Sequence, residues 1–206
     1  STGVIYVATT PDYVEVACES AGTLKTYMPN IPVCLFTGEY YIPKMPNINT
    51  VVRIRNPCRD TEDKIRPMID SPFYKTLFLD ADTEIMGDLS EVFDLLDSFE
   101  FAYAHAPVRI ESCDFSEDHY LNTNIPQCFP QPNTGVIAYK KTDRVLELLK
   151  GWEERDIEYK AKRYGKKPHE QPALRRELYF SNAKSTVLPS EYNMRTPFPM
   201  FKGGNS

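Results

Sequence analysis

The chain has 206 residues, a formal net charge of −5, 41% hydrophobic residues and 26% charged residues. This length and composition are typical of one globular domain, which we expect to span residues 1–206, either alone or as one part of a longer multidomain chain. The excess of acidic residues argues against nucleic acid as the main partner, because a phosphate backbone is bound by clustered Lys and Arg.

The five cysteines, an odd number, show neither a C-x-x-C pair nor the spacing of a zinc site. A reduced, intracellular chain fits this pattern, and we expect a cytoplasmic location. No stretch approaches the length of a transmembrane helix. The first residues read as a strand rather than as a signal peptide.

Strands and helices alternate along the chain. Short apolar runs predict strands at Val4–Val7, Ile31–Thr37, Thr50–Ile54, Tyr74–Leu79, Phe101–Ala104, Asn133–Lys141 and Ser185–Leu188. Helical spacing of apolar residues predicts helices from Pro11 to Pro29, over Asp60–Ile69 with a break at Pro67, after Asp88, from Val145 to near Arg163, and over Pro168–Phe180. This alternation predicts an α/β domain with a largely parallel central sheet.

Two helix starts and one long connection carry further signals. Thr10 is expected to cap a helix that has Pro11 at its first position. Asp88 and Glu91 have the spacing of a capping box. Pro107–Pro132 shows little periodicity, and a connection of that length inside a compact domain is often a functional loop.

An acidic pair, Asp80 and Asp82, follows the predicted strand Tyr74–Leu79. Residues i and i+2 of an extended chain point to the same side, so we expect the two carboxylates to share one face. Two carboxylates on one side suit Mg²⁺ or Mn²⁺, which prefer oxygen ligands and keep positions open for phosphate. The alternative is that the pair simply begins a loop and caps Thr83. The buried strand before the pair and the amphipathic helix after it favour a metal site.

Two classes of enzyme present a carboxylate pair in this way. Haloacid-dehalogenase phosphatases carry D-x-D-x-[TV] after a strand near the start of the domain, whereas here three predicted strands come first. Glycosyltransferases of the GT-A type carry a D-x-D motif after a later strand.

The block FLDADTEIMGDLSEVFD resembles the second class, and most closely the family eight enzymes that include glycogenin and bacterial galactosyltransferases. Other blocks follow in the order of that family: VATTPDY, DKIRPM, PNTGVIAY, HEQPAL and LPSEYN. The resemblance covers most of the chain and implies the GT-A fold, a Rossmann-like, mostly parallel sheet flanked by helices.

The resemblance implies a role for each matched residue. The nucleotide of the donor would lie on Ala8, Thr9, Thr10, Tyr13, Asp80 and Ala81, and the metal, Mn²⁺ or Mg²⁺, on Asp80 and Asp82. Asn133 would contact the donor sugar. Lys64, Glu170 and Gln171 would contact the donor sugar and also act in catalysis. Asn193 would be structural or would face the acceptor.

Two residues depart from the family pattern. Glu170 stands where the family has Asp, one methylene shorter. The family's third metal ligand is a His in a C-terminal H-x-x-G-x-x-K-P-W segment, and the three histidines here are His105, His119 and His169. The family segment would fall about where the chain stops, so either the sequence is a truncated form or the metal site is completed in another way.

The function that the resemblance implies is transfer of a sugar from a UDP-sugar donor to a glycan or other hydroxyl acceptor, dependent on a metal and with retention of configuration. Two alternatives stay open: a phosphatase that uses the same D-x-D, and a module that binds a sugar nucleotide without turnover.

Overall fold

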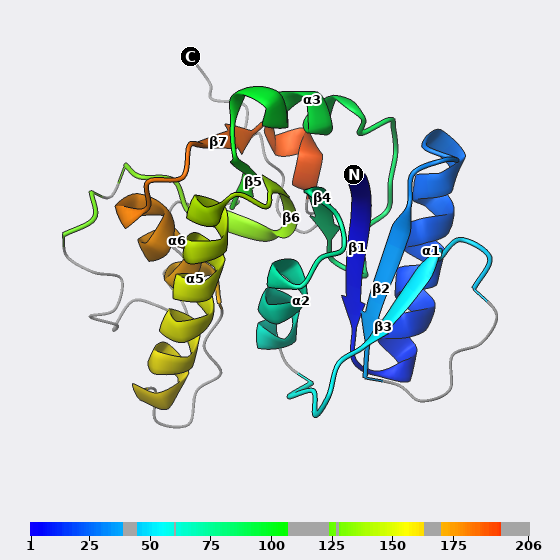
Figure 1. The fold of residues 1–206 in the computed structure, drawn as a ribbon, viewed down its shortest axis with the longest axis horizontal. Coiled ribbons are helices and arrows are strands. Elements are labelled where there is room, and N and C mark those ends of the chain that lie inside the picture. The colour runs from blue at the N-terminus through cyan, green and yellow to red at the C-terminus, as the bar shows by residue number, and fades with distance from the viewer. Residues whose placement is uncertain (39–44, 60, 107–123, 127, 163–169, 195–206) are drawn as a thin grey trace, which may run out of the picture.

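The structure is a computed structural model that describes residues 1–38, 45–59, 61–106, 124–126, 128–162 and 170–194. Its strands are β1 (Thr2–Ala8), β2 (Val33–Thr37), β3 (Thr50–Arg53), β4 (Lys75–Leu79), β5 (Phe101–His105), β6 (Pro132–Lys140) and β7 (Ser185–Leu188). Its α-helices are α1 (Pro11–Tyr27), α2 (Ile65–Ile69), α3 (Glu91–Ser98), α5 (Asp143–Lys162) and α6 (Gln171–Phe180). Two 3₁₀ turns, η1 (Thr61–Lys64) and η3 (Ser190–Asn193), complete the described elements (Figure 1).

The strands form one sheet in the order β3-β2-β1-β4-β6-β5-β7. All paired strands are parallel except β6, which runs antiparallel to both β4 and β5. The predicted α/β fold with a mostly parallel sheet is therefore confirmed. The chain moves outward from β1 to β3 and then returns to β4 on the other side of β1, and in open α/β sheets ligands bind at the carboxyl ends of strands where the order reverses in this way.

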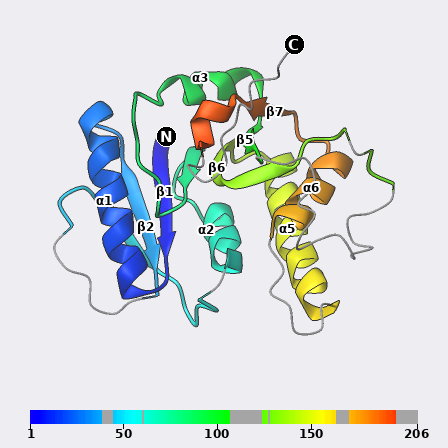
Figure 2. The ribbon, with the colours of Figure 1, turned by 180° about the vertical axis from the view of Figure 1, so that it is seen from behind.

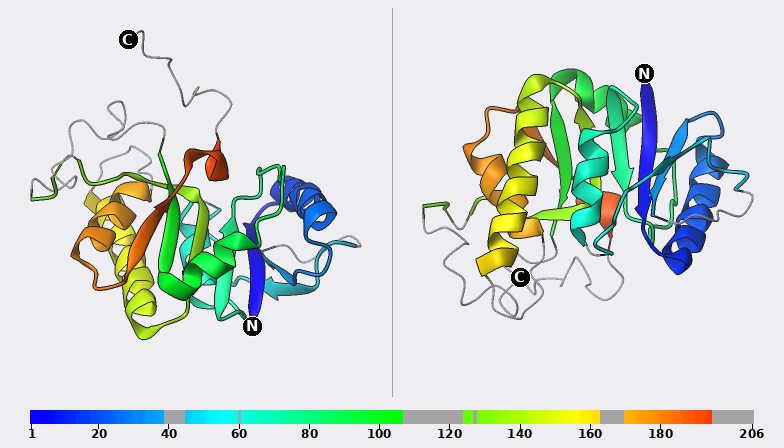
Figure 3. Two further views of the ribbon diagram at one scale, coloured as in Figure 1. Left: turned by 90° about the horizontal axis from the view of Figure 1, so that it is seen from above. Right: turned by 60° about the horizontal axis from the view of Figure 1, so that its bottom comes forward.

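Helices cover both faces of the sheet, because each strand turns alternate side chains to opposite sides. In β1, Val4 and Tyr6 pack with α1 and α3, whereas Ile5 packs with α2, α5 and α6. Figure 2 shows α1 beside β1 and β2, and the right-hand view of Figure 3 shows α2 and α5 side by side over the sheet. The polar residues that directly follow β1 and β4, Thr9 and Asp80, belong to neither apolar cluster.

The helix starts differ from expectation in one place. Thr10 is the N-cap of α1 and Pro11 its first residue, as predicted, although the Thr10 side chain makes no capping hydrogen bond. Asp88 does not cap α3: its Oδ1 accepts a hydrogen bond from the backbone N–H of Ser90, 2.8 Å away, and the helix begins at Glu91. The short Asx turn competes successfully with the capping box.

The segment expected over Asp60–Ile69 is a 3₁₀ turn followed by α2. Pro67 does not break it, because a proline in the first turn of a helix removes an N–H that has no partner inside the helix. Most of the long connection Pro107–Pro132 and the end of the helix expected near Arg163 lie outside the described residues, as do His119 and His169. In the described part of the chain, no helix is both long and apolar enough to cross a membrane.

Candidate active site

The topology brings three stretches of chain to one edge of the sheet. β1 and β4 are parallel neighbours, so Ala8, the last residue of β1, and Asp80, the first residue after β4, lie at the same edge. β6 is antiparallel to β4, so its first residues meet the end of β4, and the Asp80 N–H donates to the carbonyl of Gly135 at 2.8 Å. The acidic pair and the segment around Asn133, far apart in sequence, therefore lie together.

A register shift in β6 shapes this edge. Tyr103 of β5 pairs with Ile137, but the next residue, Ala104, pairs with Asn133. Three residues of β6, residues 134–136, therefore have no opposite residue on β5. Bulges of this kind bend a strand and redirect its side chains. Here the bulge contains Thr134 and Gly135, and both face the end of β4.

A buried ionic cluster occupies the site. The Lys64 Nζ lies 2.8 Å from Glu170 Oε1 and 3.4 Å from Asp80 Oδ1. It also donates to Thr134 Oγ1 at 3.0 Å, and the Thr134 hydroxyl donates in turn to Glu170 Oε1. The side chains of Lys64 and Glu170 are almost fully buried. The structure thus brings together three of the predicted site residues and adds Thr134.

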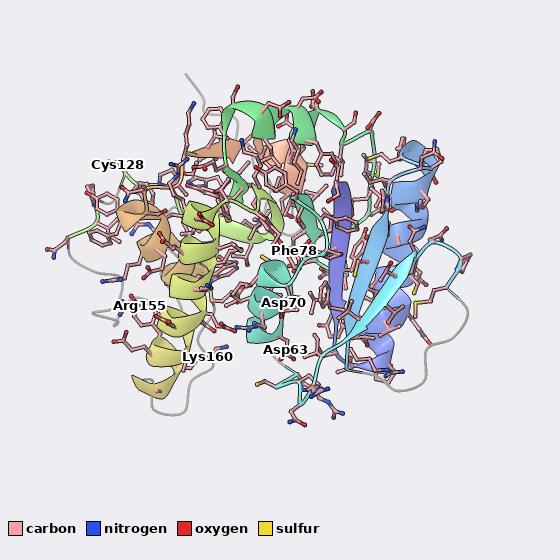
Figure 4. The ribbon with its side chains drawn as sticks, viewed as in Figure 1. Asp63, Asp70, Phe78, Cys128, Arg155 and Lys160 are labelled. Atoms are coloured by element: carbon pink, nitrogen blue, oxygen red, sulfur yellow. The ribbon has the colours of Figure 1, made fainter. Side chains whose placement is uncertain are left out.

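The loop before Lys64 is held by one carboxylate. Asp63 accepts hydrogen bonds from the backbone N–H groups of Cys58 and Arg59, at 2.8 and 2.7 Å. Arg59 has a positive φ of 59°, which marks a tight reversal of the chain. The reversal leads into η1, which contains Asp63, labelled in Figure 4. Lys64, at the end of η1, places its ammonium 5.7 Å from the centre of the Phe78 ring. Lys64 is therefore held from both its backbone and its side chain.

Glu170 is anchored in the core through its backbone. It occupies the N-cap position of α6, and its carbonyl accepts a hydrogen bond from the indole N–H of Trp152 at 2.9 Å. Trp152 is completely buried within α5. The departure from the family pattern at position 170 is thus accommodated: the longer Glu side chain reaches Lys64.

The charges in the cluster support one another. Burial alone would lower the pKa of the Lys64 ammonium, but the charges of Asp80 and Glu170 raise it, so Lys64 stays charged. Burial alone would raise the pKa of Glu170, but Lys64 and the hydrogen bond from Thr134 lower it to about 2. Asp80 differs, because loss of hydration raises its pKa, Lys64 offsets this only in part, and Glu170 and Asp82 raise it further.

The acidic pair lies in a turn and not on an extended chain. The Thr83 N–H donates to the carbonyl of Asp80 at 3.2 Å, which closes a turn over the four residues Asp80–Thr83. Asp82 is exposed, and the Asp80 side chain is 37% exposed. The expectation of strand geometry is therefore wrong, and the turn sets the angle between the two carboxylates.

The donor set fits a divalent cation in part. Among the described residues, no group of three or more His, Cys, Asp and Glu side chains converges as a metal site. However, the site contains the three carboxylates of Asp80, Asp82 and Glu170 and the one ammonium of Lys64. The charge of Asp82 also raises the pKa of Asp80. This excess of negative charge suits Mg²⁺ or Mn²⁺, which often takes only one or two protein carboxylates and completes its shell with water and phosphate oxygens.

Several buried polar atoms in and next to the same elements have no partner. They are Gln131 Nε2, Asn133 Nδ2, Glu170 Oε2, Gln171 Oε1 and Asn193 Nδ2. Unpartnered buried polar atoms are costly, so a concentration of them marks a place where a polar ligand can bind. Of the four residues expected to contact the donor sugar, Asn133, Glu170 and Gln171 are in this group, whereas the Lys64 ammonium is paired.

The residues expected to hold the nucleotide line the first part of this edge. Ala8, Thr9 and Ala81 are buried, so they can offer mainly backbone groups and small contact surfaces. Tyr13, in the first turn of α1, keeps 57% of its surface exposed. An exposed aromatic ring at this position can stack on a base.

Two residues of the site, Thr134 and Gly135, were not among those expected. A Cβ atom on Gly135 would lie 2.8 Å from Asn193 Nδ2 and 3.1 Å from Asp80 Oδ2, so the glycine is needed for space. Both residues belong to the block PNTGVIAY, and a buried hydroxyl next to a glycine inside an apolar strand was the signal that could have identified them.

Comparison with known proteins finds similarity in structure only. No family model matches the chain, and no curated protein is similar to it in sequence. The galactosyltransferase LgtC, solved with donor and acceptor sugar analogues, superposes over 92% of this chain and 74% of its own, with a TM-score of 0.58 and 14% identity.

Two further glycosyltransferases are similar. GlyE of Streptococcus pneumoniae TIGR4 matches over 95% of this chain and 47% of its own, with a TM-score of 0.61 and 16% identity. The bifunctional glycosyltransferase WbbM matches over 93% of this chain and 39% of its own, with a TM-score of 0.59 and 15% identity. The chain thus spans less than half the length of these two proteins, and it has the GT-A fold that all three glycosyltransferases share.

Proposed function

We propose that the protein is a glycosyltransferase that takes a sugar from a UDP-sugar donor and passes it, with retention, to a hydroxyl of a glycan or another acceptor. The observation that carries the proposal is the Lys64 ammonium, held between Asp80 and Glu170 at the strand ends where the sheet order reverses. The GT-A fold and the unpartnered polar atoms beside this ion cluster support it.

The donor would bind along the edge from β1 to α6. Uracil would stack on Tyr13, and the ribose would lie on Ala8–Thr10. The diphosphate would face Asp80, Asp82 and Lys64. The sugar would meet the free polar atoms of Asn133, Glu170 and Gln171, which can hydrogen-bond to its hydroxyl groups.

Charge neutralisation would be the main catalytic effect. Departure of UDP places negative charge on the diphosphate, and Lys64 would follow that charge as a compact cation. A divalent cation at Asp80 and Asp82 would supply the same kind of stabilisation when bound. Glu170 would face the positive charge that develops on the sugar ring in an oxocarbenium-like transition state.

A thermal-shift screen tests this proposal, because a specific ligand raises the melting temperature according to its affinity. UDP and UDP-sugars with Mn²⁺ should stabilise the protein more than ADP or GDP with Mn²⁺, and EDTA should remove the difference. Equal stabilisation by all nucleotides would argue against a UDP donor. Metal-dependent release of phosphate from sugar phosphates would favour the phosphatase instead, and UDP binding without turnover would favour the binding module.

A further inference from the structure

A chain of three hydroxyl groups joins β1 and α1 to the acidic turn. The Tyr6 hydroxyl lies 3.0 Å from Ser20 Oγ, and Ser20 Oγ lies 3.0 Å from Thr83 Oγ1. The Thr83 hydroxyl then donates to the carbonyl of Asp80 at 2.8 Å. Tyr6 and Ser20 are buried, so water does not compete with the first link of the chain.

The direction of each hydrogen bond follows from the number of protons. A hydroxyl donates one hydrogen bond. Since Thr83 donates to the Asp80 carbonyl, Ser20 must donate to Thr83, and Tyr6 must donate to Ser20. Burial raises the pKa of Tyr6 to about 12, so its proton is present at neutral pH. All three hydroxyls therefore have one defined orientation.

A second link holds the segment just beyond the turn. The Thr23 hydroxyl donates to the carbonyl of Ser20 at 2.8 Å and accepts from the N–H of Ile85 at 3.0 Å. Ser20 and Thr23 lie one turn apart on α1. α1 is thus hydrogen-bonded to Thr83 and to Ile85, the residues that follow Asp80 and Asp82 in the chain.

We infer that Ser20 and Thr83 are positioning residues that set the angle between the Asp80 and Asp82 carboxylates for a divalent cation, an inference that rests on the proposed function for the presence of that cation. The turn, and not strand geometry, orients the pair, and the carbonyl that closes the turn receives both the N–H and the hydroxyl of Thr83. Neither Ser20 nor Thr83 needs to touch the cation, since partners outside the ligand shell orient the ligands.

The link also joins the two halves of the donor site. α1 carries Tyr13 in its first turn and Ser20 two turns later. A rigid helix that holds the acidic turn therefore also fixes the distance between the base and the diphosphate.

The experiment compares four variants by two measurements. Mn²⁺ affinity in the presence of UDP is measured by electron paramagnetic resonance, and amide exchange of the peptide over residues 80–86 by mass spectrometry. Thr83→Val removes the hydroxyl at nearly constant volume, Thr83→Ser restores it, and Ser20→Ala removes the preceding donor. Thr26→Val is the matched control, because the Thr26 hydroxyl lies on the exposed side of α1 and donates to the Gly22 carbonyl of the same helix.

Thr83→Val should weaken Mn²⁺ binding on the order of 10- to 100-fold and speed exchange of residues 80–86, as loss of an outer partner of a metal ligand does. Ser20→Ala should act in the same direction, Thr83→Ser should recover most of the affinity, and Thr26→Val should match the wild type. A valine variant that binds Mn²⁺ as well as the wild type would overturn the positioning role alone. A wild type that binds no Mn²⁺ with UDP would overturn the proposed function together with the cation assumed here.

Discussion

The Lys64 ammonium lies 2.8 Å from Oε1 of Glu170, and this contact joins η1, the turn before α2, to the start of α6. Both side chains are almost fully buried, so neither charge is well hydrated. Removing one partner of a buried ion pair is costly because the other charge is left uncompensated. The cluster is therefore expected to affect stability as well as the proposed catalysis, and the two effects need separate measurements.

We expect Lys64→Met to lower the free energy of unfolding by about 3–5 kcal/mol, because Glu170 loses its counter-ion. The double variant Lys64→Met/Glu170→Gln should lose less than the sum of its two single variants, with a coupling free energy of about 0.5–3 kcal/mol. Urea unfolding of the wild type, the two single variants and the double variant measures this coupling free energy. Arg66→Met is the control, since Arg66 is 61% exposed and pairs only at the surface. Strictly additive losses would show that the contact does not couple the two residues.

We expect catalysis, as well as stability, to depend on Lys64. Lys64→Ala should cost about 2–4 kcal/mol in kcat/KM for UDP release, the range of one electrostatic stabiliser, with kcat itself reduced. Lys64→Arg should not fully restore activity, because its planar guanidinium places the charge differently. A loss of less than a few-fold in folded Lys64→Ala would place Lys64 outside the reaction.

Gly135 offers a test of space in the site. A Cβ at this position would press on Asn193 and Asp80, so Gly135→Ala should weaken UDP–Mn²⁺ binding at least tenfold, about 1.4 kcal/mol. Gly87→Ala is the matched control, because a Cβ on Gly87 would have open space around it. Calorimetric titration of both variants gives the answer. Equal affinities of Gly135→Ala and Gly87→Ala for UDP–Mn²⁺ would contradict the prediction, because they would show that a Cβ at position 135 does not displace Asp80.

Tyr13 provides the test of base binding. Tyr13→Ala should weaken UDP binding by about 1–3 kcal/mol, the usual contribution of a stacked base, and should change stability little because the ring is 57% exposed. Tyr27→Ala, at the other end of the same helix and 43% exposed, should bind UDP as the wild type does. The comparison is made by titration with UDP and with uridine. Equal weakening in both variants would point to a general effect on α1.

The lowered pKa of Glu100 predicts how the free energy of unfolding changes at acidic pH. The Glu100 carboxylate receives two hydrogen bonds from Arg144, at 3.0 and 2.7 Å, and one from the Lys184 N–H at 3.0 Å. The Arg144 hydrogen bonds outweigh burial and lower its pKa to about 2 from the ordinary 4.5. A lowered carboxyl pKa stabilises the fold fully above the unfolded value and loses that stabilisation as pH falls towards 2.

Glu100→Gln should therefore be less stable than the wild type at about pH 6, and the difference should shrink at about pH 3. Urea unfolding at the two pH values measures the difference. Asp94→Asn, on the exposed side of α3, serves as the control. A constant difference across this pH range would show that the Glu100 charge does not contribute.

The fold could be predicted from the sequence because its signals are local. The buried run ending at Leu79 and the Thr10-Pro11 helix start specify their elements without help from distant residues. The start of α3 was predicted wrongly because the Asp88 side chain accepts a hydrogen bond from the Ser90 N–H, two residues on, and does not cap the helix. The antiparallel direction of β6 could not be deduced, since a buried strand has the same pattern in either direction.

The sequence predicted individual residues of the site, but not how they contact one another. Lys64, Asp80 and Glu170 were expected to serve one ligand, but their mutual ion pairs depend on distant segments meeting at the sheet edge. Thr134 enters the site through a bulge in β6, for which the adjacent Gly135 was the local signal in the sequence. The turn at Asp80–Thr83 was mistaken for extended chain, because its closing hydroxyl is fixed from α1.

The most direct test of the proposed function is release of UDP from a panel of UDP-sugars, with and without Mn²⁺, by the wild type and by Asp80→Asn. The substitution keeps the size of the side chain and removes the charge that faces Lys64 and would face the proposed cation. We expect the wild type to release UDP from at least one sugar in a Mn²⁺-dependent way, and Asp80→Asn to lose that activity while it remains folded. Release by Asp80→Asn at the wild-type rate, or by the wild type equally well in EDTA, would contradict the account.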